Sequence, residues 1–228
     1  MRAGSNALDS SLIRRPARGV MGVATTLFGC LMLVVSGLLM AAAAPEPAAV
    51  PSRWQLDFRP GELRVTTIET ANGPRMYYYL PYTVINNSGQ DLLFAPSFEL
   101  ATDDGELMRS GRGVPIEVTR KIIEGLENPF VQDQIAIIGQ ILQGRENAKD
   151  GVVIWPVGET DATEVTIYGA GFSGETDTVV IPDPNNPNGE GKKVVLRKTM
   201  MIRYRIPGTL EGQRSAPLQE IERRWIMR

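Results

Sequence analysis

The sequence contains no histidine and only one cysteine, Cys30. These two absences exclude the Ser-His-Asp and Cys-His nucleophile systems, because each of them needs an imidazole to move a proton. They also exclude disulfide frameworks and zinc sites built from histidine and cysteine. No glycine-rich phosphate loop occurs in the chain either. Most of the familiar catalytic and metal chemistry therefore lacks its parts, and we expect no cofactor.

What the chain does contain is enough apolar material for a folded core. Of its 228 residues, 43 % are hydrophobic and 22 % are charged, which is ordinary for a globular protein. This length allows one or two domains. The sequence shows no internal repeat, so we expect a single core built from non-repeating elements.

The N-terminal region has the features of a leader. Three arginines precede an uncharged run over residues 19–44 that ends in four alanines, an order that is typical of a signal peptide. At ~1.5 Å per residue the same run is also long enough to cross a bilayer as an uncleaved anchor. Pro45 disfavours cleavage directly after the alanines. We interpret residues 1–44 as a signal peptide or N-terminal membrane anchor, which leaves the rest outside the cytoplasm.

Cys30 closes the segment Leu27-Phe28-Gly29-Cys30, which has the outline of a lipoprotein signal. A lipidated cysteine is normally followed by a polar tether, whereas here the apolar run continues to Ala44. We therefore interpret Cys30 as one more small apolar residue of the leader.

Charge is distributed unevenly along the chain. Residues 192–228 carry ten basic and three acidic side chains, whereas residues 45–191 carry ten basic and 22 acidic ones. The weakly acidic total gives no reason to expect a nucleic acid as partner. The basic C-terminal region is explained either by strands that pair with acidic neighbours or by the binding of an anionic partner.

Alternating apolar and polar residues between turn signals predict a chain of short strands after an Ala/Pro-rich linker at residues 45–51. The predicted strands cover residues 54–58, 63–65, 76–85, 92–94, 98–100, 152–155, 165–168, 178–181 and 194–206. We expect an Ig-like antiparallel β-sandwich over residues 52–228, preceded by the hydrophobic leader helix. Its three tryptophans, Trp54, Trp155 and Trp225, should be mostly buried.

One segment, at about residues 115–148, departs from the strand pattern. Asn128-Pro129 has the residue types that start a helix, since Asn caps free N–H groups and Pro tolerates the first helical position. Apolar residues then recur every three or four positions, which predicts an amphipathic helix over residues 129–143. A shorter helix is predicted over residues 118–126. We interpret the whole segment as a helical insertion that packs over an open end or edge of the sandwich.

Several segments together resemble known exported proteins. Residues 79–89, with Phe98-Glu99-Leu100 and Asp103-Asp104-Gly105, are similar to the core hairpin of bacterial Ig-like domains. Further matching segments are Gly151–Trp155, Thr166–Tyr168 with Gly171, Arg197–Thr199 with Tyr204 and Pro207-Gly208, and Trp225-Ile226 near Arg228. The whole resembles an uncharacterised family of exported bacterial proteins with an Ig-like β-sandwich domain. This resemblance implies a fold and a compartment, and it carries no catalytic residue to this chain.

Acidic loop residues are the only candidates for catalysis. A glycosidase needs two carboxylates that face each other across a sugar, and the acidic loop residues are Asp103, Asp104, Glu106, Asp161 and Glu164. Nothing singles out a pair, since acidic turns are usually solvated. The loop at residues 183–190 offers oxygen ligands but does not have the spacing of an EF-hand. A histidine-independent hydrolase that uses two loop carboxylates therefore stays as the alternative function.

Four tyrosines, at positions 77, 78, 79 and 82, offer a stacking platform for sugar rings. Alternation along a strand places Tyr77 and Tyr79 on one face and Tyr78 and Tyr82 on the other, so at least half of them belong to a core. We also expect Val84 to point away from the face of Tyr82.

The last predicted strand carries the candidate partner-binding residues Arg197, Arg203 and Arg205. Alternation places them on its outward face together with Thr199 and Met201. This row of cations is able to bind an anionic partner, or it pairs with acidic side chains of a neighbouring strand.

Taken together, these features predict a non-enzymatic module of the cell envelope, exported to the periplasm, the cell surface or the exterior, with a binding or structural role. The expected partner is an envelope protein or an anionic envelope polymer. We expect no metal and no nucleic acid, and contact with a membrane only through residues 19–44.

Overall fold

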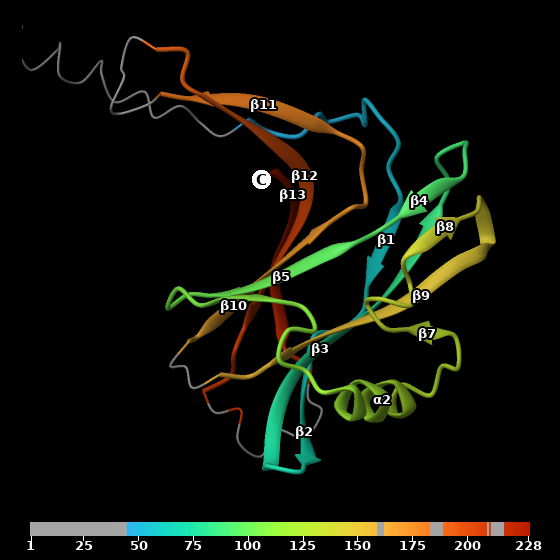
Figure 1. Cartoon of the computed structure of the whole chain (residues 1–228), viewed down its shortest axis with the longest axis vertical. Helices are drawn as coiled ribbons and strands as arrows, with labels where there is room; N and C mark the ends of the chain where they lie inside the picture. The colour runs from blue at the N-terminus through green and yellow to red at the C-terminus, as the bar shows by residue number, and fades with distance from the viewer. Residues whose placement is uncertain (1–44, 159–161, 183–188, 209, 211–216) are drawn as a thin grey trace, which may run out of the picture. The chain divides into compact units, whose positions relative to one another are not determined.

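A computed structural model describes residues 45–158, 162–182, 189–208, 210 and 217–228 of the chain. Within these residues the fold is mainly β, with two main sheets, a two-stranded ribbon and one α-helix (Figure 1). Among the same residues, no helix is long and apolar enough to cross a membrane. The predicted leader at residues 1–44 lies outside the described part of the chain, so its interpretation stays a prediction.

The first sheet is organised by one long strand. Strand β3 (Gly73–Asn86) pairs along one edge with β1 (Asp57–Pro60) and then with β2 (Arg64–Thr70). Its other edge pairs antiparallel with β9 (Gly144–Pro156), and β7 (Val131–Gln132) runs parallel to β9. A single strand of 14 residues therefore aligns the strands on both of its edges.

The second sheet is built in the same way around β12 (Lys192–Arg205). One edge of β12 pairs with β10 (Glu164–Ala170) and, further along, with β11 (Thr176–Ile181). Its other edge pairs with β13 (Gln219–Met227), and β5 (Ser97–Thr102) lies beyond β10. The half of β12 that pairs with β11 extends past the rest of the sheet.

The remaining strands are short. Strand β6 (Leu107–Arg109) forms a hairpin with β5, in which Gly105 adopts the positive φ of 99° that the predicted Asp-Gly turn needs. Strands β4 (Leu92–Phe94) and β8 (Gly139–Ile141) form the separate two-stranded ribbon. This ribbon brings Phe94 and Ile141 into the core, where both are fully buried.

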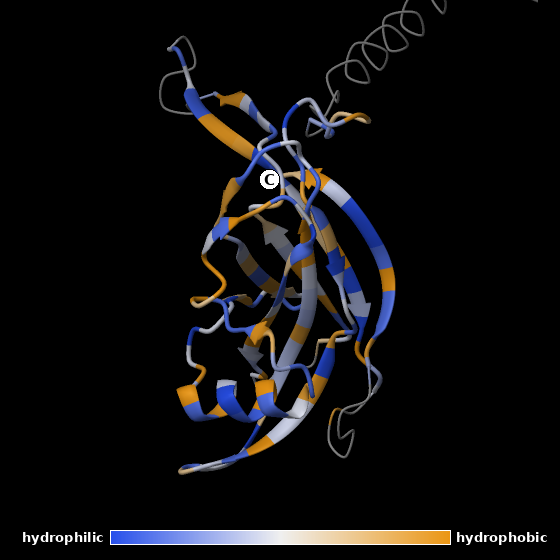
Figure 2. Cartoon of the chain, turned by 90° about the vertical axis from the view of Figure 1, so that its right-hand side faces the viewer, coloured by the Kyte–Doolittle hydropathy of each residue, from blue (hydrophilic) through white to orange (hydrophobic). Residues whose placement is uncertain are grey.

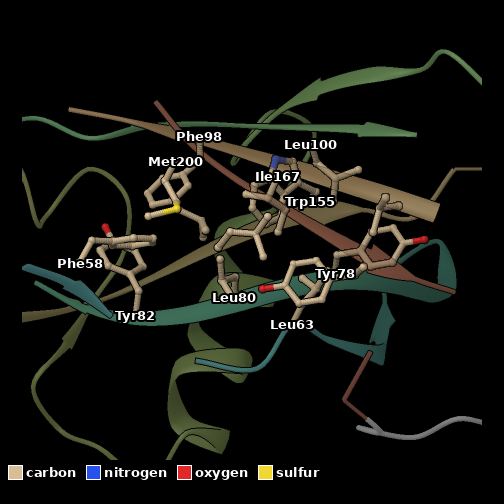
Figure 3. Packing of buried hydrophobic residues seen from close by; sticks show 14 of the residues in the cluster. Phe58, Leu63, Tyr78, Leu80, Tyr82, Phe98, Leu100, Trp155, Ile167 and Met200 are labelled. Atoms are coloured by element: carbon tan, nitrogen blue, oxygen red, sulfur yellow. The ribbon is translucent and has the colours of Figure 1, made fainter. Parts of the chain in front are cut away.

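The main core lies between the two sheets, as in a sandwich (Figure 3). Tyr78, Leu80 and Tyr82 point inward from β3 and meet side chains such as Leu100 and Ile167 of the second sheet. Trp155 lies directly across from Tyr78 in the strand register and has no exposed surface. Burial raises the pKa of Tyr78 to about 12, so its hydroxyl stays protonated in neutral solution.

The opposite face of the first sheet is covered by the helix α2 (Ile116–Gly125). Val118 and Ile122 of the helix pack against Tyr77 and Tyr79 of β3 in a second, smaller core. The predicted division of the tyrosines between two faces is therefore confirmed, and all four rings are buried. None of them is available as a stacking platform.

The prediction of a helix over residues 129–143 is wrong. The segment forms β7, a turn and β8. The side-chain oxygens of Asn128 and Asp133 accept hydrogen bonds from N–H groups two or three residues ahead, and the amide of Asn128 also donates to Asp150 of β9. Gly139 has a φ of 151°, which no helix accepts, and the β-branched isoleucines favour extended chain. Of the insertion at about residues 115–148, only α2 is an α-helix, and the rest contributes the fully buried side chains of Ile137 and Ile141 to the core.

Most of the predicted strands are confirmed, including those over residues 76–85, 98–100 and 165–168. The structure adds β7, β8 and β13, which the sequence pattern did not identify. The described fold is mainly β with antiparallel sheets in a sandwich-like arrangement, and the Ig-like assignment stays a prediction. All described residues belong to one compact unit, Ala44–Arg228.

Two predictions about orientation and burial need correction. Tyr82 and Val84 lie in the same core, because residues two positions apart in a regular strand share a face. Trp155 is buried as expected, whereas Trp54 and Trp225 are only partly buried and pack against the margin of the core.

Gly151 of β9 is required by the packing of the core. It lies opposite Tyr82 in the strand register, and the tyrosine ring covers it. A Cβ atom at position 151 would lie 2.5 Å from Tyr82 Cζ and 2.6 Å from Ile137 Cδ1. Both neighbours are themselves buried, so neither has free space to move into.

We expect Gly151→Ala to lower the free energy of unfolding by about 2 kcal/mol, because overpacking forces buried groups to shift. Urea unfolding followed by tryptophan fluorescence measures this loss. The control is Gly125→Ala at the end of α2, where a Cβ meets nothing within 4 Å. Equal stability of the two variants would contradict the packing argument.

A buried ion pair marks the point where β12 leaves the core. Lys198 Nζ lies 2.9 Å from Glu175 Oε2, and the two side chains are only 3 % and 9 % exposed. The other oxygen, Oε1, accepts a hydrogen bond of 2.7 Å from the N–H of Ala48, and Lys198 also lies over the ring of Trp225. The Ala48 N–H and, to a lesser degree, Lys198 hold the pKa of Glu175 below its usual value.

Replacing Lys198 with methionine should lower the free energy of unfolding by about 3 kcal/mol, because it removes the cation from a buried carboxylate. Replacing Glu175 with leucine at the same time should recover part of that loss. Both values come from urea unfolding at neutral pH. Additive losses in the double variant would show that the two side chains act independently.

The same ion pair predicts a pH dependence. Because the pKa of Glu175 is lowered in the folded state, its carboxylate stabilises the fold above the unfolded pKa of ~4.3. This contribution is lost as the pH falls through the lower, folded pKa. The difference in stability between the natural protein and Glu175→Gln should therefore shrink between pH ~7 and pH ~3. If the difference in stability between the two proteins does not change with pH, the ionised Glu175 carboxylate is not its source.

Candidate partner-binding surface

The three predicted arginines lie on the outward face of β12, but they do not form a continuous row of free cations. Thr199 and Met201 separate Arg197 from Arg203, and both are buried although they point outward. Met201 lies between Tyr168 of β10 and Arg224 of β13 in the strand register. The neighbouring strands therefore cover the middle of the predicted row.

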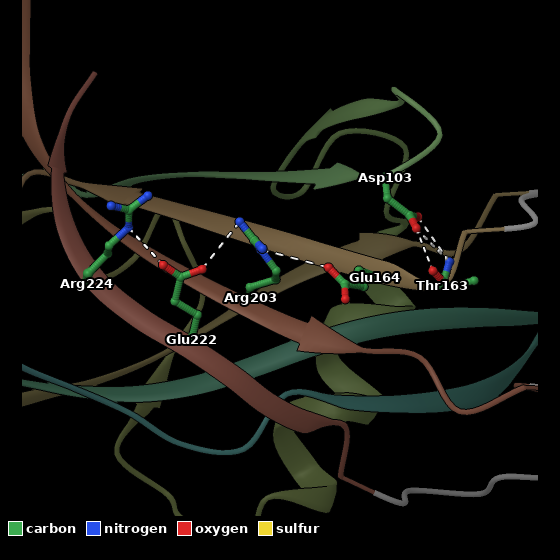
Figure 4. Close-up of polar contacts among 6 residues, drawn as sticks. All are labelled: Asp103, Thr163, Glu164, Arg203, Glu222 and Arg224. Carbon is green, nitrogen blue, oxygen red and sulfur yellow. Dashed lines mark hydrogen bonds and ion pairs between the residues drawn. The ribbon is translucent and has the colours of Figure 1, made fainter. Parts of the chain in front are cut away.

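Arg203 is held between two carboxylates. Its Nη2 lies 3.3 Å from Glu222 Oε2 on β13, and its Nε lies 4.0 Å from Glu164 Oε2 on β10 (Figure 4). Glu222 in turn binds Arg224, with 2.9 Å between Oε1 and Nε. The charges alternate across three strands, so Arg203 has the role of a cross-strand partner that was one of the two sequence interpretations.

A second group of alternating charges lies across the same face. Arg228 donates a hydrogen bond of 2.6 Å to Glu99 of β5, and Arg109 of β6 lies 3.5 Å from the other oxygen of this carboxylate. The guanidinium of Arg228 also stacks over the ring of Tyr168, with its Cζ 4.1 Å from the ring centroid. Cation–π stacking and ion pairing together orient this C-terminal side chain.

Arg197 and Arg205 differ from Arg203, because both are exposed and neither forms an ion pair with any described residue. Arg205 lies at the end of β12, between Glu164 and Gln219 in the register. Arg197 lies eight residues earlier, ~26 Å away along the strand. Its backbone exchanges two hydrogen bonds with Arg228.

The described residues give this surface a net positive charge. We define the arginine face as the outward side of the second sheet, where the strand register places six arginines and three glutamates. The arginines are Arg109, Arg197, Arg203, Arg205, Arg224 and Arg228, and the glutamates are Glu99, Glu164 and Glu222. The glutamates hold the central arginines in place, and the excess of cations faces solvent.

The acidic loop residues that the structure describes give no support to a catalytic pair. Asp103 accepts hydrogen bonds from the N–H and the hydroxyl of Thr163, which lower the pKa of its carboxyl (Figure 4). It therefore stays ionised and ties the β5–β6 hairpin to the start of β10. Asp161 lies outside the described residues, as do positions 183–188 of the loop with oxygen ligands. Within the described part of the chain, no group of three acidic or cysteine side chains is placed to bind a metal.

The partners of the arginines were not apparent in the sequence. Glu222 and Arg224 lie on β13, a strand that was not predicted, and Glu99 lies on β5, about 130 residues before its partner Arg228. Glu222, Arg224 and Ile226 occupy alternate positions of β13, but the sequence does not show that β12 is the adjacent strand.

No family model matches the chain, and no curated protein or solved structure is significantly similar to it.

The two kinds of arginine should respond differently to substitution. We expect Arg203→Ala to lower the free energy of unfolding by up to about 1 kcal/mol, because it leaves Glu164 and Glu222 without their shared cation. Arg205→Ala should change the stability by less than ~0.5 kcal/mol. Urea unfolding of both variants measures the difference. A larger loss of stability in Arg205→Ala than in Arg203→Ala would contradict the role of Arg203 as the paired, cross-strand arginine.

Proposed function

We propose that the protein is a non-enzymatic, exported module of the cell envelope that binds an acidic partner on the arginine face. The observation that carries this proposal is the exposure of Arg197 and Arg205 at opposite ends of a sheet face whose central arginine is already paired. The partner is an envelope protein with an acidic surface or an anionic envelope polymer.

The geometry suits binding because the surface is rigid before the partner arrives. The arginine face lies on a paired sheet whose inner side packs in the main core. The glutamates fix the guanidinium groups of Arg203, Arg224 and Arg228, so less conformational entropy is lost on binding. The exposed arginines add electrostatic attraction that raises the rate of association and weakens as salt is added.

The compartment is part of the same proposal. The basic residues before an uncharged run at residues 19–44 support export, with the remainder of the chain outside the cytoplasm. A domain without histidine or cysteine folds in an oxidising or a reducing compartment alike. The contacts of Asp103 do not favour the two-carboxylate hydrolase, since this carboxylate is used to hold a loop.

The test uses the full chain and labelled poly-glutamate as a probe for an anionic partner. We expect Arg197→Gln with Arg205→Gln to weaken binding about tenfold at low ionic strength and to flatten the salt dependence. The matched control is Arg75→Gln with Arg145→Gln, two exposed arginines of the first sheet. Equal loss in both double variants would mean that binding follows net charge and not the arginine face.

The same variants are then used for capture from envelope extracts, with the folded state checked by unfolding. A partner that is lost from the Arg197/Arg205 variant and kept by the control supports the proposal. Unchanged capture by both variants, or hydrolysis of an envelope polysaccharide by the purified protein, would overturn it.

A further inference from the structure

The outer halves of β11 and β12 extend beyond the rest of the second sheet as a two-stranded arm. We define the arm as residues 176–181 and 192–197, which pair with each other along its whole length; within the described part of the chain, the other strand pairing of the arm is at its base, where Arg197 exchanges backbone hydrogen bonds with Arg228. Figures 1 and 2 show it projecting from the body of the domain, and its base lies close to the described N-terminal residues, where Ala48 binds Glu175. With two strands and no covering layer, the arm has no core of its own.

Apolar side chains are exposed on both sides of the arm. Val180 and Ile181 are 53 % and 51 % exposed, and Val195 is 59 % exposed. Consecutive residues of a strand point to opposite faces, so Val180 and Ile181 lie on different sides of the arm. Isolated two-stranded ribbons are only marginally stable in water. The arm therefore presents apolar groups that gain free energy when they are removed from water.

Basic residues accompany these apolar groups. Lys193 lies opposite Val180 and Lys192 lies opposite Ile181 in the strand register, and Arg197 lies at the base of the arm. The acidic residue within the two strands is Asp177. A surface that combines exposed aliphatic side chains with lysines matches the interface of an anionic bilayer, where apolar groups enter the headgroup region and ammonium groups meet phosphates.

The N-terminal chain places a limit on how far the arm lies from a membrane. Ala48 is held at the base of the arm, because its N–H binds Glu175, which lies directly before β11. The uncharged run of the sequence ends at Ala44, only four residues earlier. Four residues of fully extended chain span at most ~14 Å. If the run is embedded in a bilayer, the base of the arm lies within that reach of the surface.

We propose that the outer end of the arm enters the interface of an anionic bilayer, with Val180 and Ile181 of its two faces in the headgroup region and Lys192 and Lys193 against lipid phosphates. This inference goes beyond the proposed function. The residues that it places at the membrane lie on the arm, whereas the paired arginines lie on the part of the second sheet that covers the core. It takes the alternative in which the run at residues 19–44 is retained as an anchor. The short tether and the basic, apolar composition of the arm favour lipid over a protein as the occupant.

The experiment follows the environment of the arm in the membrane-anchored full chain. A single cysteine is placed by Ile181→Cys in a Cys30→Ser background and labelled with an environment-sensitive fluorophore. The protein is reconstituted in vesicles of about 30 % phosphatidylglycerol in phosphatidylcholine. We expect quenching of the label by lipids brominated on their acyl chains. The control label at Ile116→Cys, on the exposed start of α2 far from the arm in Figure 1, should stay unquenched.

Charge variants test the role of the lysines. Lys192→Gln with Lys193→Gln should lower the ratio of lipid-bound to free arm about tenfold or more, since each lysine near an anionic surface adds to the attraction. Arg75→Gln with Arg145→Gln should leave the ratio unchanged. An unquenched label at position 181, or equal quenching at position 116, would overturn the proposal. Protection of position 181 only after an envelope extract is added would assign the arm to a protein partner instead.

Retention of the anchor is measured on the protein isolated from cells. Mass spectrometry of the membrane fraction should find a chain that still contains residues 19–44. A chain that begins near residue 45 would overturn this proposal and leave the arginine face unaffected, so the two proposals fail separately.

Discussion

The arm and the N-terminal tail are both held to the domain by the ion pair between Lys198 and Glu175. Lys198 occupies the inward row of β12 just beyond the core, where an unpaired ammonium group would be costly to bury. Glu175 neutralises it from the break between β10 and β11 and also binds the N–H of Ala48. One ion pair therefore joins the end of the core, the base of the arm and the N-terminal tail.

The two faces of the second sheet follow different physical rules. The inner face is apolar and packs against the first sheet, whereas the outer face alternates arginine and glutamate across β5, β10, β12 and β13. Exposed ion pairs add little stability, but they hold long side chains in a defined arrangement. Arg203 is used in this way, and the uncompensated charge is left at the two ends of the arginine face, on Arg197 and Arg205. The surface is thus ordered at its centre and attractive to anions at its ends.

The arm and the arginine face are parts of one strand with different environments. Near the core, β12 has a neighbour on each edge, and its outward side chains from Thr199 to Arg203 are covered or paired. Past Arg197, towards Lys192, it keeps only β11 among the described residues, so valine and lysine side chains face solvent on both sides. Because the N-terminal tail is fixed at the boundary between the two halves, an anchored chain would hold the arm close to the membrane and leave the arginine face free for a partner.

The sequence by itself determined the period of the strands and therefore which residues share a face. Tyr77 and Tyr79 separate from Tyr78 and Tyr82 because alternation is a local property of extended chain, and the outward placement of Arg203 and Arg205 follows in the same way. The segment at residues 129–143 was not predictable from its spacing, since apolar residues three and four apart also occur where a turn closes a core. Only the tertiary structure decided that Ile137 and Ile141 are buried there. It also decided that Glu222 and Glu164, from strands distant in sequence, neutralise Arg203. Periodicity is set within a few residues, whereas the identity of a neighbouring strand depends on long-range packing that no local pattern contains.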